Sequence, residues 1–416
     1  MTHPYGRIKA ACYINSVGMA AVANLTPILL LTFRELYDIS YSLLGFLVLV
    51  NFCTQLAVDL IFSFFSHKFN IPFMVKSIPV VMAAGMIVYA LLPCFFPSRA
   101  FLGLLVGTVI FSMSGGLAEV LASPTVAAIP SDNPDREMSR LHSMYAWGVV
   151  GMVLLGTGFL ALFGREAWPL LVLLIALVPL FTFFFSIGAA VPVMESEKKE
   201  DCVKGYLKSG LLWLCFFAMF CGGAAECTMG QWCSGYIEGA LGIPKLWGDI
   251  FGMAAFSLTL GLGRTLYAKR GKRIERVLTL GALGATVCYL AAAVVPVPAV
   301  GLIACALTGL CTAMMWPGCL LVVVKNFPAA GVFIYAAMAA GGDFGAAAGP
   351  QMVGAITDAI AANGAMAELA LRLSLTPDGL GMRVGMLVGA LFPLGAFILY
   401  RALSKKDRKK IEYCEY

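Results

Sequence analysis

The sequence predicts an all-α membrane protein with twelve transmembrane helices in two pseudo-symmetric six-helix bundles. Three observations lead to this prediction: an apolar composition, a one-sided distribution of basic residues, and an internal repeat. The chain has 416 residues, of which 60% are hydrophobic and 12% are charged, about half the charged fraction of a soluble domain. Its mean hydropathy is +0.87. Such a chain has too few polar groups to cover its surface in water, whereas a bilayer accepts an apolar surface.

Twelve segments are long and apolar enough to cross a bilayer, which requires about 20 residues each. They cover residues 8–33, 41–65, 73–96, 101–129, 140–164, 167–191, 208–231, 247–269, 275–295, 298–325, 328–360 and 381–403. The most polar internal stretch separates the first six spans from the last six. We therefore expect an N-terminal bundle over 1–193, a cytoplasmic linker over 194–209, a C-terminal bundle over 210–403 and a cytoplasmic tail over 404–416.

The basic residues support this count and orient the chain. If the N-terminus is cytoplasmic, 22 of the 29 Lys and Arg residues fall in inside loops or at the adjoining span ends, six fall in outside loops or at the adjoining span ends, and Arg264 alone lies within a span away from its ends. Because Lys and Arg concentrate in cytoplasmic loops, this asymmetry predicts that both termini are cytoplasmic, in a plasma (inner) membrane. The net charge of +6 comes from these short loops, so it does not indicate a nucleic-acid partner.

A repeated motif relates the two halves. Span four contains Gly116-Leu117 with Pro124 seven residues after the leucine, and span ten contains the same pattern 193 residues later, in Gly309-Leu310 and Pro317. Chance similarity between glycine-rich helices is the competing explanation. Duplicated halves predict a solute site at their interface near the bilayer midplane, which rocking of the halves exposes alternately to each side.

The arrangement of two six-helix halves, a charged central loop and short basic loops after spans two and eight resembles the major facilitator superfamily. Short motifs look more narrowly like its fucose permease-like branch: Gln55-Leu56-x-x-Asp59, Glu119 with Ser123-Pro124, Leu141-His142 through Trp147-Gly148, Trp316-Pro317-Gly318, and Gly341-Gly342-Asp343-Phe344-Gly345. The resemblance covers nearly the whole chain and implies a proton-coupled sugar symporter that works by alternating access.

Two departures limit what the resemblance implies. The superfamily's loop after span two usually reads Gly-x-x-x-Asp-Arg-x-Gly, whereas here it has Ser63, His67 and Lys68. Proton-coupled fucose permeases have one acid in span one and another in span four. Glu119 matches the second acid, but span one has only neutral polar residues. A two-acid proton relay therefore does not carry over directly.

Five ionisable residues in the spans are the first functional candidates, because each costs about 2.5–3.5 kcal/mol to insert. They are Asp59, Glu119, Glu226, Arg264 and Asp343. Glu119 has no cation nearby in sequence, so its burial favours the protonated form, and we expect it to bind protons or solute. Asp343, flanked by glycines, is expected to act in coupling or gating. For both residues, structural pairing with another helix is the alternative.

The other three charged candidates lie nearer to span ends. Asp59 and Arg264 are expected to be inner-gate contacts, with Arg264 reaching the acidic loop 132–137 or else extending to the headgroups. Glu226 lies in the sequence CGGAAECTMGQW. This glycine-rich stretch predicts a broken span seven in which Glu226 faces the solute or makes an outer-gate or interhelical hydrogen bond.

The expected solute site is mostly neutral. Besides the acids, its candidates are His142, Asn24, Gln55, Gln231, Trp232, Trp316 and Gln351. His142 is expected either to carry protons or to contact headgroups at a helix end. A carrier of organic anions needs a midplane Arg or Lys, so the set favours a neutral polyhydroxy solute of the monosaccharide kind. Proton-driven efflux of amphipathic or cationic compounds is the alternative function.

The sequence argues against an enzyme or a metalloprotein. No HExxH or GxSxG-type motif occurs, and the 13 cysteines form no CxxC pair, so they are interpreted as small packing residues. We expect no catalytic residue, metal site or cofactor, and a monomer whose partners are the solute, the lipid bilayer and protons. Na⁺ is the alternative coupling ion, since carboxylates and carbonyls bind it as well.

Overall fold

The computed structural model describes residues 4–39, 41–194, 205–243, 245–327 and 331–414, and the regular structure within these ranges is helical. Twelve helical segments among the described residues are long and apolar enough to span a membrane. The predicted fold class and the number of spans are therefore confirmed.

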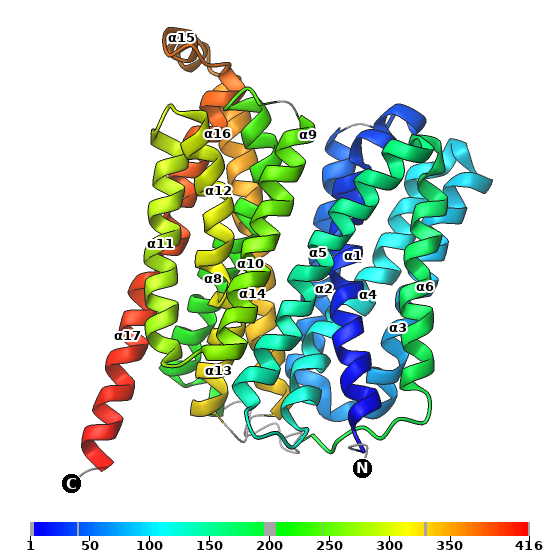
Figure 1. The fold of residues 1–416 in the computed structure, drawn as a ribbon, viewed down its shortest axis with the longest axis vertical. Coiled ribbons are helices and arrows are strands. Elements are labelled where there is room, and N and C mark those ends of the chain that lie inside the picture. The colour runs from blue at the N-terminus through cyan, green and yellow to red at the C-terminus, as the bar shows by residue number, and fades with distance from the viewer. Residues whose placement is uncertain (1–3, 40, 195–204, 244, 328–330, 415–416) are drawn as a thin grey trace. The chain divides into compact units, whose positions relative to one another are not determined.

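The first six spans are single helices (Figure 1). They are α1 (Gly6–Tyr37), α2 (Tyr41–Phe65), α3 (Ile71–Phe95), α4 (Ala100–Ala127), α5 (Pro134–Phe163) and α6 (Trp168–Ser186). Short 3₁₀ turns, η1 (Ser66–Lys68), η2 (Pro97–Arg99) and η3 (Arg165–Ala167), lie in the connections. Local chemistry defines the helix starts: Asn70 caps α3 and Asn133 caps α5, each through a side-chain oxygen that accepts from the backbone three residues ahead.

The second half contains more helices than spans. It comprises α8 (Gly210–Gly239), α9 (Lys245–Gly248), the π-helical turn η4 (Asp249–Ala254), α10 (Ala255–Arg270), α11 (Ile274–Val294), α12 (Pro298–Thr312), α13 (Met315–Asn326), α14 (Gly331–Ala361), α15 (Gly364–Arg372), α16 (Pro377–Gly389) and α17 (Leu391–Cys414). Span eight includes part of η4 followed by α10, span ten is α12 followed by α13, and span twelve is α16 followed by α17.

The chain divides into two compact units. Unit 1 holds residues 1–203 together with 327–340, and unit 2 holds residues 204–326 and 341–416. The start of α14 thus belongs to the unit of the first six spans, while the rest of that helix belongs to unit 2. Most of the predicted linker over 194–209 lies outside the described residues, so that boundary stays a prediction.

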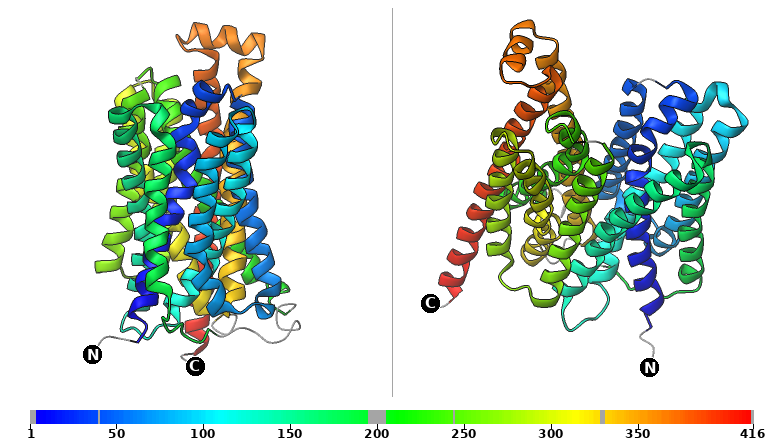
Figure 2. Two further views of the ribbon diagram at one scale, coloured as in Figure 1. Left: turned by 90° about the vertical axis from the view of Figure 1, so that its right-hand side faces the viewer. Right: turned by 45° about the horizontal axis from the view of Figure 1, so that its top comes forward.

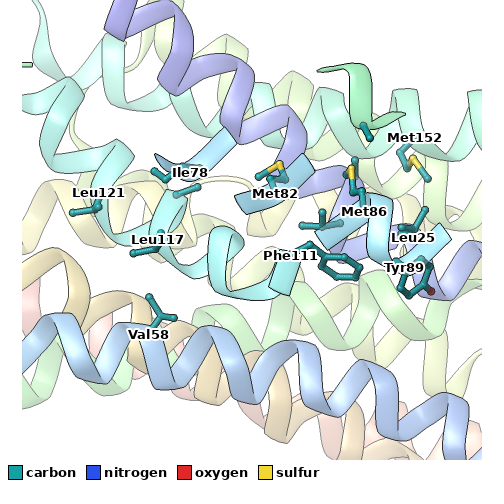
Figure 3. Packing of buried hydrophobic residues seen from close by; sticks show 14 of the residues in the cluster. Leu25, Val58, Ile78, Met82, Met86, Tyr89, Phe111, Leu117, Leu121 and Met152 are labelled. Carbon is teal, nitrogen blue, oxygen red and sulfur yellow. The ribbon is translucent and has the colours of Figure 1, made fainter. Parts of the chain in front are cut away.

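The core of unit 1 is built where α3 and α4 pack against each other and against α1 (Figure 3). Tyr89 of α3 is fully buried, with its ring centroid 5.8 Å from Phe33 and 6.1 Å from Trp168. Gly85 and Gly107 allow the close approach, because a β-carbon at either position would collide with Phe111 or Tyr89 backbone atoms of the opposite helix. Small residues bring the two backbones together here.

The two units contain equivalent contacts. Gly116 of α4 packs on Gln55 and Val58 of α2, and Gly309 of α12 packs on Phe256 and Thr259 of α10. Gln55 and Phe256 are 201 positions apart, and so are Val58 and Thr259. This offset is close to the 193-residue spacing of the two glycines.

A second equivalent contact joins the third span of each unit to its first. The Tyr89 hydroxyl lies 3.0 Å from the Thr26 hydroxyl, and the Tyr289 hydroxyl donates to the Ala225 carbonyl at 2.8 Å. Both tyrosines are fully buried. These contacts support the internal repeat proposed from the sequence.

Two features of the second half differ from the sequence-based expectations. Span seven was expected to break near Glu226, but α8 runs without interruption from Gly210 to Gly239. Its glycines serve close packing instead, since a β-carbon at Gly223 would collide with the Gly342 carbonyl of α14. The loop between spans eleven and twelve contains an additional short helix, α15, which Figure 2 shows turned across the direction of α16.

Candidate functional site

An ion pair between α8 and α10 is the best-defined polar contact in unit 2. The Arg264 Nη2 atom lies 2.8 Å from Glu226 Oε1 and 2.9 Å from Oε2. The Arg264 Nε atom also donates to the Ala313 carbonyl at 2.8 Å, at the end of α12. Arg264 is 2% exposed and Glu226 is 8% exposed. Because a lone buried charge is costly, each side chain stabilises the other in this apolar setting.

This pair joins two residues whose roles were predicted separately, Glu226 as solute-lining and Arg264 as an inner-gate contact. The carboxylate and the guanidinium satisfy each other inside unit 2. The expected contact of Arg264 with the acidic loop 132–137 joins residues of different units and stays a prediction.

Both candidate tryptophans of unit 2 lie against α14. The Trp232 ring nitrogen donates to the Pro350 carbonyl at 3.0 Å. The Trp316 ring covers Gly342 so closely that a β-carbon there would collide with it. Both rings are partly exposed. Glycine at position 342 therefore lets an aromatic face lie directly on the backbone beside Asp343.

The remaining unit 2 candidates differ in burial. Asp343 is 4% exposed, next to the residue that Trp316 covers. Gln231 is partly exposed beside Trp232, and Gln351 is exposed. Trp316 of α13 thus lies on Gly342, the neighbour of Asp343 in α14, while Trp232 of α8 binds Pro350, the neighbour of Gln351 further along α14.

In unit 1, a second group of candidates gathers around the glycine-rich part of α4. Gly115 and Gly116 lie against Gln55 of α2, which is 6% exposed. Glu119 is one turn further along α4 and is partly exposed. Another turn on, the Ser123 hydroxyl lies 3.4 Å from His142 Nε2 of α5. Gln55, Glu119 and His142 thus lie on α2, α4 and α5, and α4 contacts both of the other helices.

The span-one polar residues lie on α1, which packs against α4 and α5, and Asp59 lies on α2. Asn24 donates to the Ala20 carbonyl of its own helix at 2.8 Å, and Ser16 bonds to the Cys12 carbonyl at 3.2 Å. Asn15 is 3% exposed, and its side-chain oxygen has no hydrogen-bond partner among the described residues. Asp59 is fully buried one turn beyond Gln55.

Two polar clusters in unit 1 were not predicted from the sequence. Ser112 of α4 donates to the Asn51 side chain of α2 at 2.5 Å, and both residues are buried. Asn51 precedes Gln55 by one helical turn and therefore lies on the same face of α2. This spacing is the sequence signal that could have identified Asn51. Near the starts of α1 and α5, Glu137 pairs with Lys9 at 2.6 Å and accepts from Tyr13 at 2.5 Å.

The chemistry of both groups is that of binding. Carboxylates and amides accept or donate hydrogen bonds, partly exposed indole rings offer flat apolar faces, and an acid and a histidine bind protons. Among the described residues, no group of three or more His, Cys, Asp or Glu side chains forms a potential metal site.

Comparisons with known proteins agree with this architecture. The family model described as Major Facilitator Superfamily matches residues 12–350. No curated protein matches the chain. A structure of the E. coli fucose:proton symporter FucP superposes with a TM-score of 0.71 at 15% identity, covering 95% of this chain and 98% of that one.

Two further solved structures show the same fold. A proton:xylose symporter gives a TM-score of 0.72 at 12% identity, with coverage of 94% of this chain and 95% of that chain. A human organic anion transporter gives 0.65 at 16% identity, with coverage of 95% and 99%. At these identities the similarity shows the fold, and the family match spans most of the chain. The chain therefore belongs to the major facilitator superfamily, a family of membrane transporters rather than enzymes.

Proposed function

We propose that the protein is a proton-coupled symporter that moves a small neutral polyhydroxy solute, of the monosaccharide kind, by alternating access. The main support is the state of Arg264. Its guanidinium is already engaged within unit 2, where Nη2 binds the Glu226 carboxylate and Nε binds the Ala313 carbonyl. Anionic solutes are usually held by Arg or Lys side chains that offer such donors. An arginine engaged in this way favours a neutral solute.

The other candidate residues suit a sugar-like solute. Solute hydroxyls bond to Gln55, Glu119 and His142, while C–H faces pack on the rings of Trp316 and Trp232. In this proposal Glu119 binds the coupled proton. Asp343 and the gate residues Asp59 and Arg264 respond to solute and proton binding.

Two of the structural neighbours support this choice without determining it. The fucose:proton and proton:xylose symporters are named for sugars moved with protons. The low identity to both means that the solute has to be identified by experiment. We further propose an inner-membrane monomer with both termini in the cytoplasm, two bundles joined by a linker, and H⁺ rather than Na⁺ as the coupling ion.

A thermal-shift screen tests the solute class. Purified protein is heated with panels of monosaccharides, amino acids and hydrophobic cations, and the same panels are applied to Glu119→Gln. We expect some neutral sugars to raise the Tm of the unmodified chain and to act more weakly on the variant. Stabilisation by hydrophobic cations with no response to any sugar would replace this proposal with proton-driven efflux.

Uptake into vesicles tests the coupling. With an acidic exterior, the solute found in the screen should accumulate, and Glu119→Gln should reduce uptake to the level without a pH gradient, because an amide cannot carry the proton. Glu368→Gln on the exposed surface of α15 is the matched control and should behave like the unmodified chain. Gradient-driven uptake that survives Glu119→Gln would remove this residue from the proton path, and a requirement for Na⁺ would change the coupling ion.

A further inference from the structure

Span ten has a break in its helical hydrogen bonds close to Pro317, although the backbone of Ala313 keeps αR angles. Residues 313 and 314 separate α12 from α13, and Pro317 follows four residues after Ala313. In an unbroken helix the amide of residue 317 would donate to the Ala313 carbonyl, but proline has no amide hydrogen. The next bond is intact, since the Gly318 amide donates to the Met314 carbonyl at 2.8 Å. Pro317 therefore leaves one specific carbonyl without its helical donor.

Arg264 supplies the missing donor. Its Nε atom lies 2.8 Å from the Ala313 carbonyl oxygen, while its Nη2 atom holds the Glu226 carboxylate. An unsatisfied carbonyl is costly in a medium without water, and a guanidinium presents several donors in a fixed fork. The side chain thus links α8, α10 and the break in span ten.

The equivalent proline in the first half has a different outcome. Pro124 lies inside α4, which continues without a break from Ala100 to Ala127. Val58 and Thr259 make equivalent contacts and are 201 positions apart. By the same offset, Ser63 of α2 is the equivalent of Arg264 of α10. Ser63 bonds to the Asp59 carbonyl of its own helix instead. Only the second of these two equivalent spans combines the proline with an arginine donor at the break.

The residue just before Pro317 is Trp316, whose ring covers Gly342. We infer that Arg264 is a positioning residue: by binding the carbonyl that Pro317 leaves free, and held in place by Glu226, it fixes the break in span ten and thereby the Trp316 ring. The inference adds to the proposed function, in which Trp316 contacts the solute. It concerns the position of the ring, so it is tested without any solute.

A double-mutant cycle tests the link between the arginine and the proline. The first change is the neutral pair Glu226→Gln with Arg264→Gln, which removes the guanidinium without leaving a single buried charge. The second is Pro317→Ala, which restores a helical donor for Ala313. We expect the neutral pair to lower the Tm by several degrees in the unmodified chain, and by less than half as much when Pro317→Ala is also present.

Matched controls separate this coupling from general loss of packing. Arg383 donates to the Ala240 carbonyl at 3.3 Å in the same unit, so Arg383→Gln should lower the Tm equally with and without Pro317→Ala. Pro124→Ala should not alter the effect of the neutral pair. If the neutral pair does not fold, Arg264→Lys replaces it, because an ammonium group keeps the charge but lacks the fork. If the neutral pair lowers the Tm by the same amount with and without Pro317→Ala, the inference is overturned.

The position of the ring is measured by ¹⁹F NMR on protein labelled with 5-fluorotryptophan. The chain has six tryptophans, and Trp316→Phe identifies the resonance of interest. We expect the neutral pair to shift the Trp316 resonance more than the other five, and Arg383→Gln to leave it unchanged. An unmoved Trp316 resonance contradicts the positioning role, even if later transport assays identify a sugar as the solute.

Discussion

At the scale of single residues, the spans tolerate polar side chains by pairing them within a few ångströms. The Glu226–Arg264 pair and the Asn51–Ser112 contact each join two helices inside one unit. The sequence identified Glu226, Arg264 and Gln55 because charged and amide groups are rare in apolar helices. It could not identify their partners, since pairing depends on which helix faces lie together.

The Asn51–Ser112 hydrogen bond gives a stability prediction. Ser112→Ala leaves the Asn51 side-chain oxygen buried without its donor, and we expect a loss of about 1–3 kcal/mol in the free energy of unfolding. Adding Asn51→Leu should recover part of that loss, because an apolar pair leaves no polar atom unsatisfied. Reversible denaturation in detergent measures both variants. If Ser112→Ala is as stable as the unmodified chain, this bond contributes little to unit 1.

At the scale of elements, helix packing in both units depends on small residues at specific positions. Gly85 and Gly107 allow α3 to approach α4, while Gly116 and Gly309 allow α4 and α12 to approach the second span of their units. The sequence displayed these glycines but did not reveal their role. Near Glu226 it led to the wrong prediction of a broken helix, because a glycine that bends a helix and one that packs closely look alike in sequence.

A pair of glycine substitutions distinguishes packing from backbone flexibility. Gly85→Ala places a methyl group within 2.8 Å of Phe111 Cα, so we expect it to destabilise the protein by about 1–3 kcal/mol through overpacking. A methyl group added at Gly151 on α5 would have nothing within 4 Å of it, so Gly151→Ala should be neutral or slightly stabilising. Thermal melts of both variants measure the difference. Equal Tm values would show that α3 and α4 can separate enough to accept the methyl group.

At the scale of the whole molecule, composition indicates a membrane-spanning chain and charge predicts its orientation. Twelve apolar helices require lipid around them, and the excess of Lys and Arg in alternate loops predicts which side each loop faces. Both inferences depend only on the hydropathy of successive segments and on the number of Lys and Arg residues in each loop. For that reason the number of spans was predicted correctly without any knowledge of tertiary contacts.

The orientation is tested with reporter fusions. We expect a fluorescent protein fused at the C-terminus to be bright, and alkaline phosphatase inserted in the connection between α5 and α6 to be active, since the positive-inside distribution places these sites on opposite sides. Phosphatase inserted after Lys272, between α10 and α11, is the matched control and should be inactive. Activity at both insertion sites, or at the wrong one, would contradict the proposed topology.

The sequence by itself determined the class of the fold, the twelve spans, the repeat and most of the polar residues worth testing. These follow from length, hydropathy and spacing, which are properties of the chain read in order. The tertiary structure alone decided that Arg264 binds both Glu226 and the Ala313 carbonyl, that Trp316 lies on Gly342, and that span ten breaks while span four does not. The physical reason is that a buried polar group is stable only beside its partner, and the partner comes from another helix whose rotation is set by packing.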